Sequence, residues 1–322
     1  MEYRIFKEEV EKKFKEFLPE KYQNFQVEIR SVEKTNHTLD GLLIKANAPG
    51  MHISPLIDVN QMYEDYIATG DLDATLARAA ERFTKSMEQM NTIHVSEHVD
   101  PEYARDMVVF RLINTEQNKK MLANMPHREF NDLSVIYHMV AMIDGEEIAS
   151  IPIHHEFADT LGFTEDQLFK LAYENTKRLF PPLIKPVNEI MRDVLVENGM
   201  PLEIAEMMLG EISPRLQMYV ISNERSIHGT ASLLYEDMLH ELAEKLGSDL
   251  YILPASVHTG IAISTDIGDP NLLAEMVAEI NMEQVAINER LSNQVYRYDK
   301  GLQMITLATD TPNKRLDGIV RQ

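Results

Sequence analysis

The hydrophobic pattern of the N-terminal region predicts one helix, then strands, then two more helices. Apolar side chains of the first 20 residues recur three and four positions apart, as in an amphipathic helix: Phe6, Val10, Phe14 and Phe17. From Phe25 the period changes to two, which predicts strands between residues 25 and 59 with a turn at Leu39-Asp40-Gly41. Helical spacing returns at Asn60, where Met62 and Ile67 are expected on the inner face, and again from about residue 71 to residue 90.

The middle of the chain alternates strand patterns with helix signals. Residues 107–113 and 133–143 are apolar runs of strand length, and Asp144-Gly145 is a turn signal after the second run. Thr164, followed three positions later by Gln167, has the spacing of a capping box and predicts the start of a helix.

The last hundred residues predict the order β-α-β-β-α-β-β. We expect a helix over residues 230–246 closed by Gly247, strands at 250–253 and 257–263, and a helix over 271–290 that follows Asp269 as N-cap and Pro270 as first residue. Short connections favour antiparallel neighbours, so the fold class is α+β, with mixed but mainly antiparallel sheets and packed helices. Three regions are expected: an α+β region at 1–100, an α+β/helical region at 101–212 and an α+β domain at 213–322.

Charge and composition exclude several classes of protein. The 322 residues include 31 Lys and Arg against 52 Asp and Glu, a formal net charge of −21, which argues against direct nucleic-acid binding because phosphate contacts depend on basic side chains. The absence of Cys excludes disulfides and thiolate chemistry. No apolar stretch has the length of a signal peptide core or a membrane span, so a soluble, cytoplasmic protein without a membrane partner is expected. The sequence contains neither the Walker A motif Gly-x-x-x-x-Gly-Lys nor the Rossmann motif Gly-x-Gly-x-x-Gly, and no cofactor is expected.

Several blocks together resemble a family of uncharacterised bacterial proteins from gut Firmicutes that is classed as a domain of unknown function. The blocks cover about residues 25 to 300: 39–42, 53–55 with Tyr63 and Tyr66, 110–114, 126–134, 174–181 and 247–258. The family pattern has Ser before Ser256 and Glu after His258, where this chain has Ala255 and Thr259. The resemblance implies a bacterial, intracellular protein and implies no activity.

Two groups of His and acidic residues are candidate metal ligands. His94, Glu97, His98 and Asp100 form one group, and Glu236, Asp237, His240 and Glu244 form the other. On a helix Glu236, His240 and Glu244 occupy one row, and imidazole with carboxylates suits Zn, Mn or Fe. No second copy of the motif supplies the facing carboxylates of a di-metal site, so hydrogen-bonded surface His is the favoured interpretation.

Two polar segments are candidate ligand or catalytic sites. The segment Arg225, Ser226, His228, Gly229 and Thr230 stands before the expected 230–246 helix, where free backbone N–H groups could bind a phosphate or carboxylate; an ordinary helix start is the alternative. Ser256 and His258 are two positions apart on an expected strand, but no nucleophile-elbow motif accompanies them. The basic block around Arg128 could receive an acidic ligand or pair with the many carboxylates of the chain.

An acidic helix face is the last candidate. From Asp266 to Glu289 there are six acidic residues and no Lys or Arg, and Glu275, Glu279 and Glu283 form one row. Burial of Leu273, Met276, Val277 and Ile280 on the other face is expected to outweigh the repulsion. This row could bind a basic partner, or it could simply be a solvated face.

The function favoured by the sequence is non-catalytic binding of an unknown protein or small ligand. Two alternatives stay open. One is an enzyme with a site between the N- and C-terminal α+β parts, whose catalytic residues would come from distant segments. The other is an acidic decoy that mimics nucleic acid and binds a basic host factor.

Overall fold

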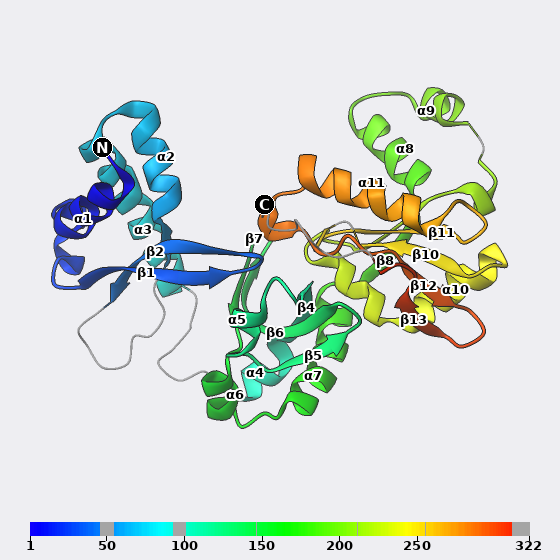
Figure 1. The fold of residues 1–322 in the computed structure, drawn as a ribbon, viewed down its shortest axis with the longest axis horizontal. Coiled ribbons are helices and arrows are strands. Elements are labelled where there is room, and N and C mark those ends of the chain that lie inside the picture. Colours follow the sequence, from blue (N-terminus) through cyan, green and yellow to red (C-terminus); the bar gives the residue numbers. More distant parts are fainter. Residues whose placement is uncertain (46–54, 93–100, 146, 211, 255, 311–322) are drawn as a thin grey trace. The chain divides into compact units, whose positions relative to one another are not determined.

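The computed structural model describes residues 1–45, 55–92, 101–145, 147–210, 212–254 and 256–310 (Figure 1). The chain divides into two compact units, Met1–Tyr103 and Ala104–Gln322. The class is α+β, as the sequence predicts, because antiparallel sheets and packed helices occur in both units. Each unit is described by itself.

The first unit packs three helices against a small antiparallel sheet. Its elements are α1 (Tyr3–Lys13), the 3₁₀ helices η1 (Phe14–Phe17) and η2 (Glu20–Tyr22), β1 (Gln26–Lys34), β2 (His37–Lys45), β3 (Ile57–Asp58), α2 (Val59–Thr69) and α3 (Leu72–Thr92). The strand order is β1-β2-β3. Phe6, Val10 and Phe14 of the predicted first helix are fully buried with Leu42 and Phe83, so the spacing of three and four does mark the core face.

Two details of the first unit differ from the sequence prediction. The turn expected at Leu39-Asp40-Gly41 is wrong, because these residues lie inside β2 and the turn is at Asn36, which has φ of 63°. Asn tolerates this left-handed conformation better than most residues, and it makes the turn without the Asp-Gly pair that typically signals one. Ile67, expected on the inner face of its helix, is exposed by 59%.

The second unit contains two sheets. α4 (Pro101–Met107) leads into a four-stranded antiparallel sheet of β4 (Val108–Asn114), β5 (His127–Phe130), β6 (Leu133–Asp144) and β7 (Glu147–Pro152). The long strand β6 pairs with β4 along one edge, and with β5 and then β7 along the other. The helices α5 (Lys119–Leu122), α6 (His155–Leu161) and α7 (Glu165–Leu179) belong to this part, and α7 packs on β4.

A six-stranded sheet forms the rest of the second unit, in the order β13-β12-β10-β11-β9-β8. Its strands are β8 (Pro182–Pro186), β9 (Tyr219–Asn223), β10 (Leu250–Leu253), β11 (Gly260–Ser264), β12 (Tyr296–Asp299) and β13 (Met304–Leu307). Strand β8 begins and ends with Pro, which suits its place at the edge of the sheet. The region boundary expected at residue 212 falls between β8 and β9. Because these two strands pair with each other, that boundary would divide one sheet between two regions.

The predicted order β-α-β-β-α-β-β is confirmed from β9 to β13, but several boundaries move. The expected 230–246 helix is a 3₁₀ helix, η4 (Gly229–Leu234), followed by α10 (Glu236–Leu246). The expected strand 257–263 is β11, which begins only at Gly260. The expected 271–290 helix is α11 (Pro270–Glu283), capped by Asp269 as predicted, and the short 3₁₀ helix η5 (Ile287–Glu289) follows it. The connections β9–α10–β10 and β11–α11–β12 each pass over one strand of the sheet and both move toward β13. Because β9 and β11 are antiparallel, right-handed crossovers place α10 and α11 on opposite faces of the sheet (Figure 1).

An aromatic cluster and several hydrogen bonds join the two sheets of the second unit. Phe110 on β4 contacts Phe169 on α7 and Tyr235 before α10, with ring centroids 6.4 and 5.9 Å apart. The carboxylate of Asp132 accepts hydrogen bonds from Ser292, at 2.6 Å, and from Tyr296. Ser292 lies shortly before β12 and Tyr296 lies on it, so the loop of Asp132 is tied to the six-stranded sheet.

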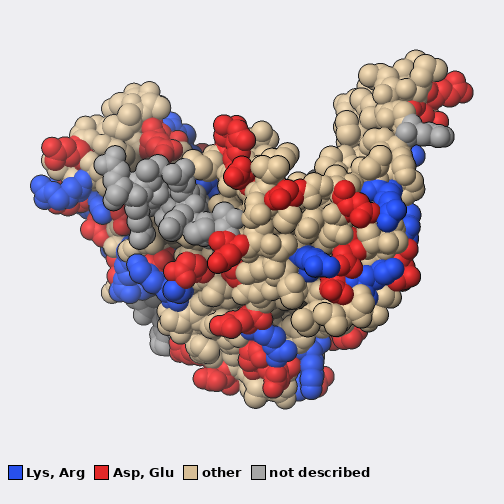
Figure 2. All heavy atoms as spheres, turned by 45° about the vertical axis from the view of Figure 1, so that its right-hand side comes forward, with Lys and Arg blue, Asp and Glu red and all other residues tan. Residues whose placement is uncertain are grey.

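Between β8 and β9 the chain forms a helical hairpin, α8 (Val187–Glu197) and α9 (Leu202–Leu209), which we call the apolar arm. The main contacts of α8 are with α9 and β8. No residue of α8 is buried, and Ala205 is the one buried residue of α9. In Figure 2 the arm projects at the upper right, and most of its surface belongs to residues that are neither acidic nor basic. The 3₁₀ helix η3 (Pro214–Leu216) follows the arm before β9.

Candidate functional site

The loop after β9 and the loop before β11 meet, and this brings together two segments that the sequence treats separately. The hydroxyl of Thr230 donates to the carbonyl of Ser256 at 2.6 Å, and the backbone N–H of His228 donates to Nδ1 of His258 at 3.2 Å. The imidazole rings of His228 and His258 lie 5.4 Å apart. The predicted anion-binding segment and the Ser256–His258 pair are therefore parts of one polar site.

The side chain of Asn223 at the end of β9 organises the first loop. Its Oδ1 accepts from the backbone N–H groups of Arg225 and Ile227, at 3.0 and 3.3 Å, and its Nδ2 donates to the carbonyl of Ile227. The loop is tight enough that Ser226 and His228 take left-handed backbone angles, with φ of 54° and 51°. Left-handed conformations of non-glycine residues cost energy and collect at functional sites.

The first loop does not form the helix start on which the anion-binding prediction rested. The N–H of Thr230 donates to the carbonyl of Val257, and the N–H of Ala231 donates to the carbonyl of His228, so neither group is free. Thr230 is fully buried. Arg225 is exposed, and its guanidinium donates to the carbonyl of Gly145 in the β6–β7 turn at 2.7 Å.

The second loop is a turn held by Ser256. Its hydroxyl oxygen accepts from the N–H groups of His258 and Thr259, at 3.2 and 3.1 Å. In the part of the chain that the structure describes, no imidazole nitrogen contacts this hydroxyl, whereas a serine nucleophile needs such a base. Because Nδ1 of His258 accepts from His228, its Nε2 carries the proton and points to Glu289, 3.7 Å away.

Three further residues complete the site from the four-stranded sheet. Arg111 on β4 donates to the hydroxyl of Ser150 at 2.6 Å, and this hydroxyl lies 3.3 Å from Nδ1 of His138. We call Arg111, His138, Ser150, His228 and His258 the imidazole–guanidinium cluster. The sequence contains a signal for Arg111, since it is the one charged residue in the apolar run Val108–Asn114, but nothing in the sequence shows which loop it faces.

The electrostatics of the cluster are set by burial. Burial lowers the pKa of Arg111 to about 10. Burial, followed by the charges of Arg111 and His258, lowers the pKa of His228 to about 2. The His228 ring is therefore neutral at neutral pH, and its Nδ1 is buried with no hydrogen-bond partner in the part of the chain that the structure describes. Perturbed titrating groups of this kind are typical of functional sites.

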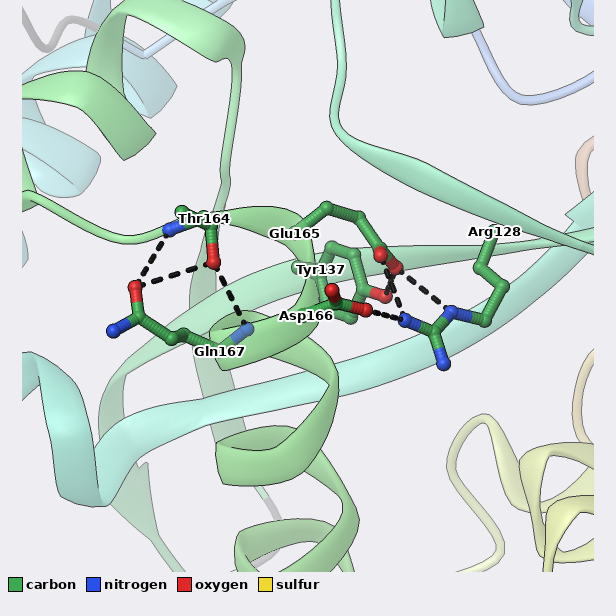
Figure 3. Close-up of polar contacts among 6 residues, drawn as sticks. All are labelled: Arg128, Tyr137, Thr164, Glu165, Asp166 and Gln167. Carbon is green, nitrogen blue, oxygen red and sulfur yellow. Dashed lines mark hydrogen bonds and ion pairs between the residues drawn. The ribbon is translucent and has the colours of Figure 1, made fainter.

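Arg128, in the basic block of the sequence, pairs with two carboxylates at the start of α7 (Figure 3). Its guanidinium forms two hydrogen bonds with Glu165, at 3.1 and 2.8 Å, and one with Asp166, at 2.6 Å. The same Glu165 carboxylate accepts from the hydroxyl of Tyr137, and the pKa of Tyr137 is raised by burial and by this contact. The capping box of Thr164 and Gln167, predicted from the sequence, is confirmed beside them. These contacts hold the start of α7 against β5 and β6. They correspond to the second interpretation of the basic block, in which its Arg pairs with carboxylates of the same chain.

The acidic row on α11 forms as expected, but only part of the predicted apolar face is buried. Glu275, Glu279 and Glu283 are all exposed. Of the four apolar residues predicted to be buried, Val277 is buried and Leu273 is half-buried, whereas Met276 and Ile280 are exposed by 56% and 40%. The helix packs through a narrower stripe of Ala274, Val277 and Asn281, so a second, apolar row of Leu272, Met276 and Ile280 lies open beside the acidic row.

Residues 3–300 match the family described as "Family of unknown function (DUF5688)". The chain belongs to this family. The match covers nearly the whole chain, so the resemblance seen in the sequence is confirmed at the level of the family. No curated protein and no solved structure matches this DUF5688 chain. None of its described helices has the length and hydropathy needed to cross a lipid bilayer.

The candidate metal ligands of the DUF5688 chain are dispersed. His94, Glu97, His98 and Asp100 lie outside the described residues. On α10, which begins at Glu236, Asp237 pairs with Lys177 and Glu244 pairs with Lys300, each at 3.3 Å, while His240 lies 3.4 Å from the amide of Gln303. Among the described residues, no three His, Asp or Glu side chains are grouped to hold a metal ion.

Proposed function

We propose that this protein binds another protein, and that the apolar arm together with α11 docks a basic, amphipathic helix of that partner. The proposal is carried by the arm, whose apolar side chains lie in water. Its exposed members are Met191, Val194, Val196, Leu202, Ile204, Met207 and Met208, with Ile212 directly after α9. Exposed surfaces on which many apolar side chains lie together are typical of interaction sites.

Helix stability gives the first argument. Short helices are marginal in water and depend on burial of an apolar face. Met207 and Met208 are exposed by 81% and 67%, so α9 gains little from burial in the isolated chain. Full burial of such a side chain contributes roughly 1.5–3 kcal/mol. A partner that covers the arm would therefore both bind and stabilise it.

Charge gives the second argument. Between Val187 and Leu209 the chain carries five acidic residues and one basic residue, Arg192, which pairs with the neighbouring Asp193 at 2.9 Å. On α11 the acidic row lies directly beside the open row of Leu272, Met276 and Ile280. Figure 1 shows α8, α9 and α11 on the same side of the six-stranded sheet. An apolar surface with an acidic border complements an amphipathic helix whose border is basic.

The same charges argue against other occupants. A second copy would bring two acidic borders together, in a chain that already carries a net charge of −21. An anionic membrane surface would be repelled for the same reason. The acidic-decoy alternative needs the row of Glu275, Glu279 and Glu283 but not the apolar row, and the apolar row is what favours an amphipathic helix.

The test uses the full chain and a synthetic helical peptide with Leu on one face and Lys on the other, followed by fluorescence anisotropy. Binding is expected in the micromolar range or tighter, and it should weaken as salt is added. Met207→Ser with Met208→Ser should weaken binding by about tenfold or more. Reversal of Glu275, Glu279 and Glu283 to Lys should weaken it and remove most of the salt dependence.

Matched controls distinguish binding at this surface from non-specific hydrophobic binding elsewhere on the protein. Ile67→Ser removes an apolar side chain of α2 that is exposed by 59%, and it should leave binding unchanged. A peptide of the same composition with Glu in place of Lys should not bind. Equal loss in the Ile67 and Met207/Met208 variants would refute the proposal, as would dimer formation in sedimentation equilibrium that the Met207/Met208 variant abolishes.

A further inference from the structure

We propose that Arg111, Ser150 and His228 form a binding site for a small ligand that carries a carboxylate or phosphate group. This inference is independent of the docking surface, because it rests on the imidazole–guanidinium cluster alone. The first observation is the isolation of the Arg111 charge. Its guanidinium donates to a neutral hydroxyl, that of Ser150, and among the described residues no carboxylate lies within ion-pair distance of it.

An unpaired guanidinium in a partly buried place is unfavourable for the fold. Removing a charge from water costs several kcal/mol unless a counter-charge and hydrogen bonds compensate it. This chain has 52 acidic residues, yet none of those described supplies the counter-charge. Arginine presents up to five N–H donors in a planar fork that fits carboxylate and phosphate groups, and the Ser150 contact uses one of them.

The second observation is the unused donor capacity around the guanidinium. Nδ1 of His228 is buried and has no hydrogen-bond partner among the described residues, and an imidazole nitrogen can donate when it carries the proton. The Ser150 hydroxyl accepts from Arg111 and also lies 3.3 Å from Nδ1 of His138. His258 is not available, since its Nδ1 accepts from His228 and its Nε2 faces Glu289.

The third observation is that separate segments hold these groups together. β4, which carries Arg111, packs against η4, which follows directly after His228. Arg225 ties the same loop to the turn that precedes the β7 strand of Ser150. Arg111, Ser150 and His228 are all partly exposed. The left-handed backbone at His228 sets the direction in which its side chain leaves the loop.

Isothermal titration calorimetry of the full chain with inorganic phosphate, and separately with succinate, tests the site. Saturable binding of at least one probe is expected below about 10 mM. Arg111→Gln should weaken it at least tenfold, and His228→Asn should weaken it severalfold, since Asn also tolerates the left-handed backbone. Arg215→Gln is the matched control: it removes one positive charge from an exposed pair with Asp266 and should change nothing.

A stability measurement separates a ligand site from a structural role. If Arg111 serves to bind a ligand, Arg111→Met should abolish binding. The unfolding midpoint of this variant should either stay unchanged or rise by about 2 °C or more. If Arg111 holds the fold together, the same variant should unfold earlier, which would overturn the proposal. Absence of saturable binding by both probes, or equal loss in Arg215→Gln, would overturn it as well. Binding of only one probe supports the proposal and shows which group the natural ligand carries.

Discussion

Replacing Gly229 with Ala should be among the most damaging small substitutions in the second unit. A Cβ atom at Gly229 would lie 2.2 Å from the hydroxyl of Ser222, 2.6 Å from the carbonyl oxygen of His258 and 2.8 Å from the backbone nitrogen of Asn223. The Ser222 hydroxyl could rotate, but it donates to that same carbonyl at 2.9 Å and would lose this bond. The other two atoms belong to the backbone of both loops of the site. Overpacking of this kind costs roughly 1–3 kcal/mol, and loss of the buried hydrogen bond adds about 1 kcal/mol, so we expect about 2–4 kcal/mol.

Urea unfolding followed by circular dichroism measures this cost directly. Gly260→Ala is the control, because Gly260 is a buried neighbour whose Cβ would meet its nearest atoms at 3.7 Å or more, an ordinary contact. That variant should stay within about 0.5 kcal/mol of the parent protein or gain slightly from the stiffer unfolded chain. If Gly229→Ala is as stable as Gly260→Ala, the two loops do not meet as described. The imidazole–guanidinium cluster would then lose its basis.

Three further predictions concern polar contacts, each measured by urea unfolding. Tyr296→Phe should cost about 1–3 kcal/mol, because it removes one of the hydrogen bonds to the carboxylate of Asp132. Asp40→Asn should destabilise the first unit more at pH 7 than at pH 3: Lys7 lowers the pKa of Asp40, so its stabilisation is present above about pH 4 and is lost as the pH falls through that lowered value. Burial lowers the pKa of His228 to about 2, so below about pH 6.5 the unfolded chain binds a proton that the folded protein excludes, and stability falls as the pH falls. His228→Asn should remove about 1–2 kcal/mol of the difference between pH 8 and pH 5, and an unchanged difference would contradict this.

Local signals in the sequence predict local structure well. The capping box at Thr164 and Gln167, the N-cap at Asp269 and the stop at Gly247 all occur where they are expected. Each depends on contacts within one turn of helix, so no distant segment can override it. The fold class follows from the order of these elements.

The turn at Asn36 and the exposed face of α11 show where sequence reasoning fails. A Gly in an alternating run is typical of a turn, whereas Gly41 lies inside a strand, where a Cβ would lie 2.4 Å from Leu56. Periodicity marks an apolar face on α11 but does not say whether another part of the chain covers it, and Met276 stays in water. Both errors concern tertiary neighbours, which one sequence does not contain.

The candidate site shows the same limit more sharply. His228 and His258 are each visible as polar residues beside a strand, but their contact depends on β9 and β11 being neighbours in the sheet. Arg111 belongs to a different sheet, separated by more than a hundred residues from either His. Strand order fixes such meetings, and the apolar pattern of a strand does not encode its neighbours.

The apolar arm and the imidazole–guanidinium cluster break local rules in opposite ways, and this makes them separable. The arm leaves apolar side chains in water, whereas the cluster partly buries a guanidinium that has no carboxylate partner among the described residues. Both cost stability, and proteins retain such features mainly where function needs them. The arm contacts chiefly β8, while the cluster is built on β4 and the loops beside β9 and β11. Met207→Ser with Met208→Ser should therefore leave phosphate or succinate binding unchanged, and Arg111→Gln should leave peptide binding unchanged. Loss of both activities in either variant would show instead that the two surfaces form one site.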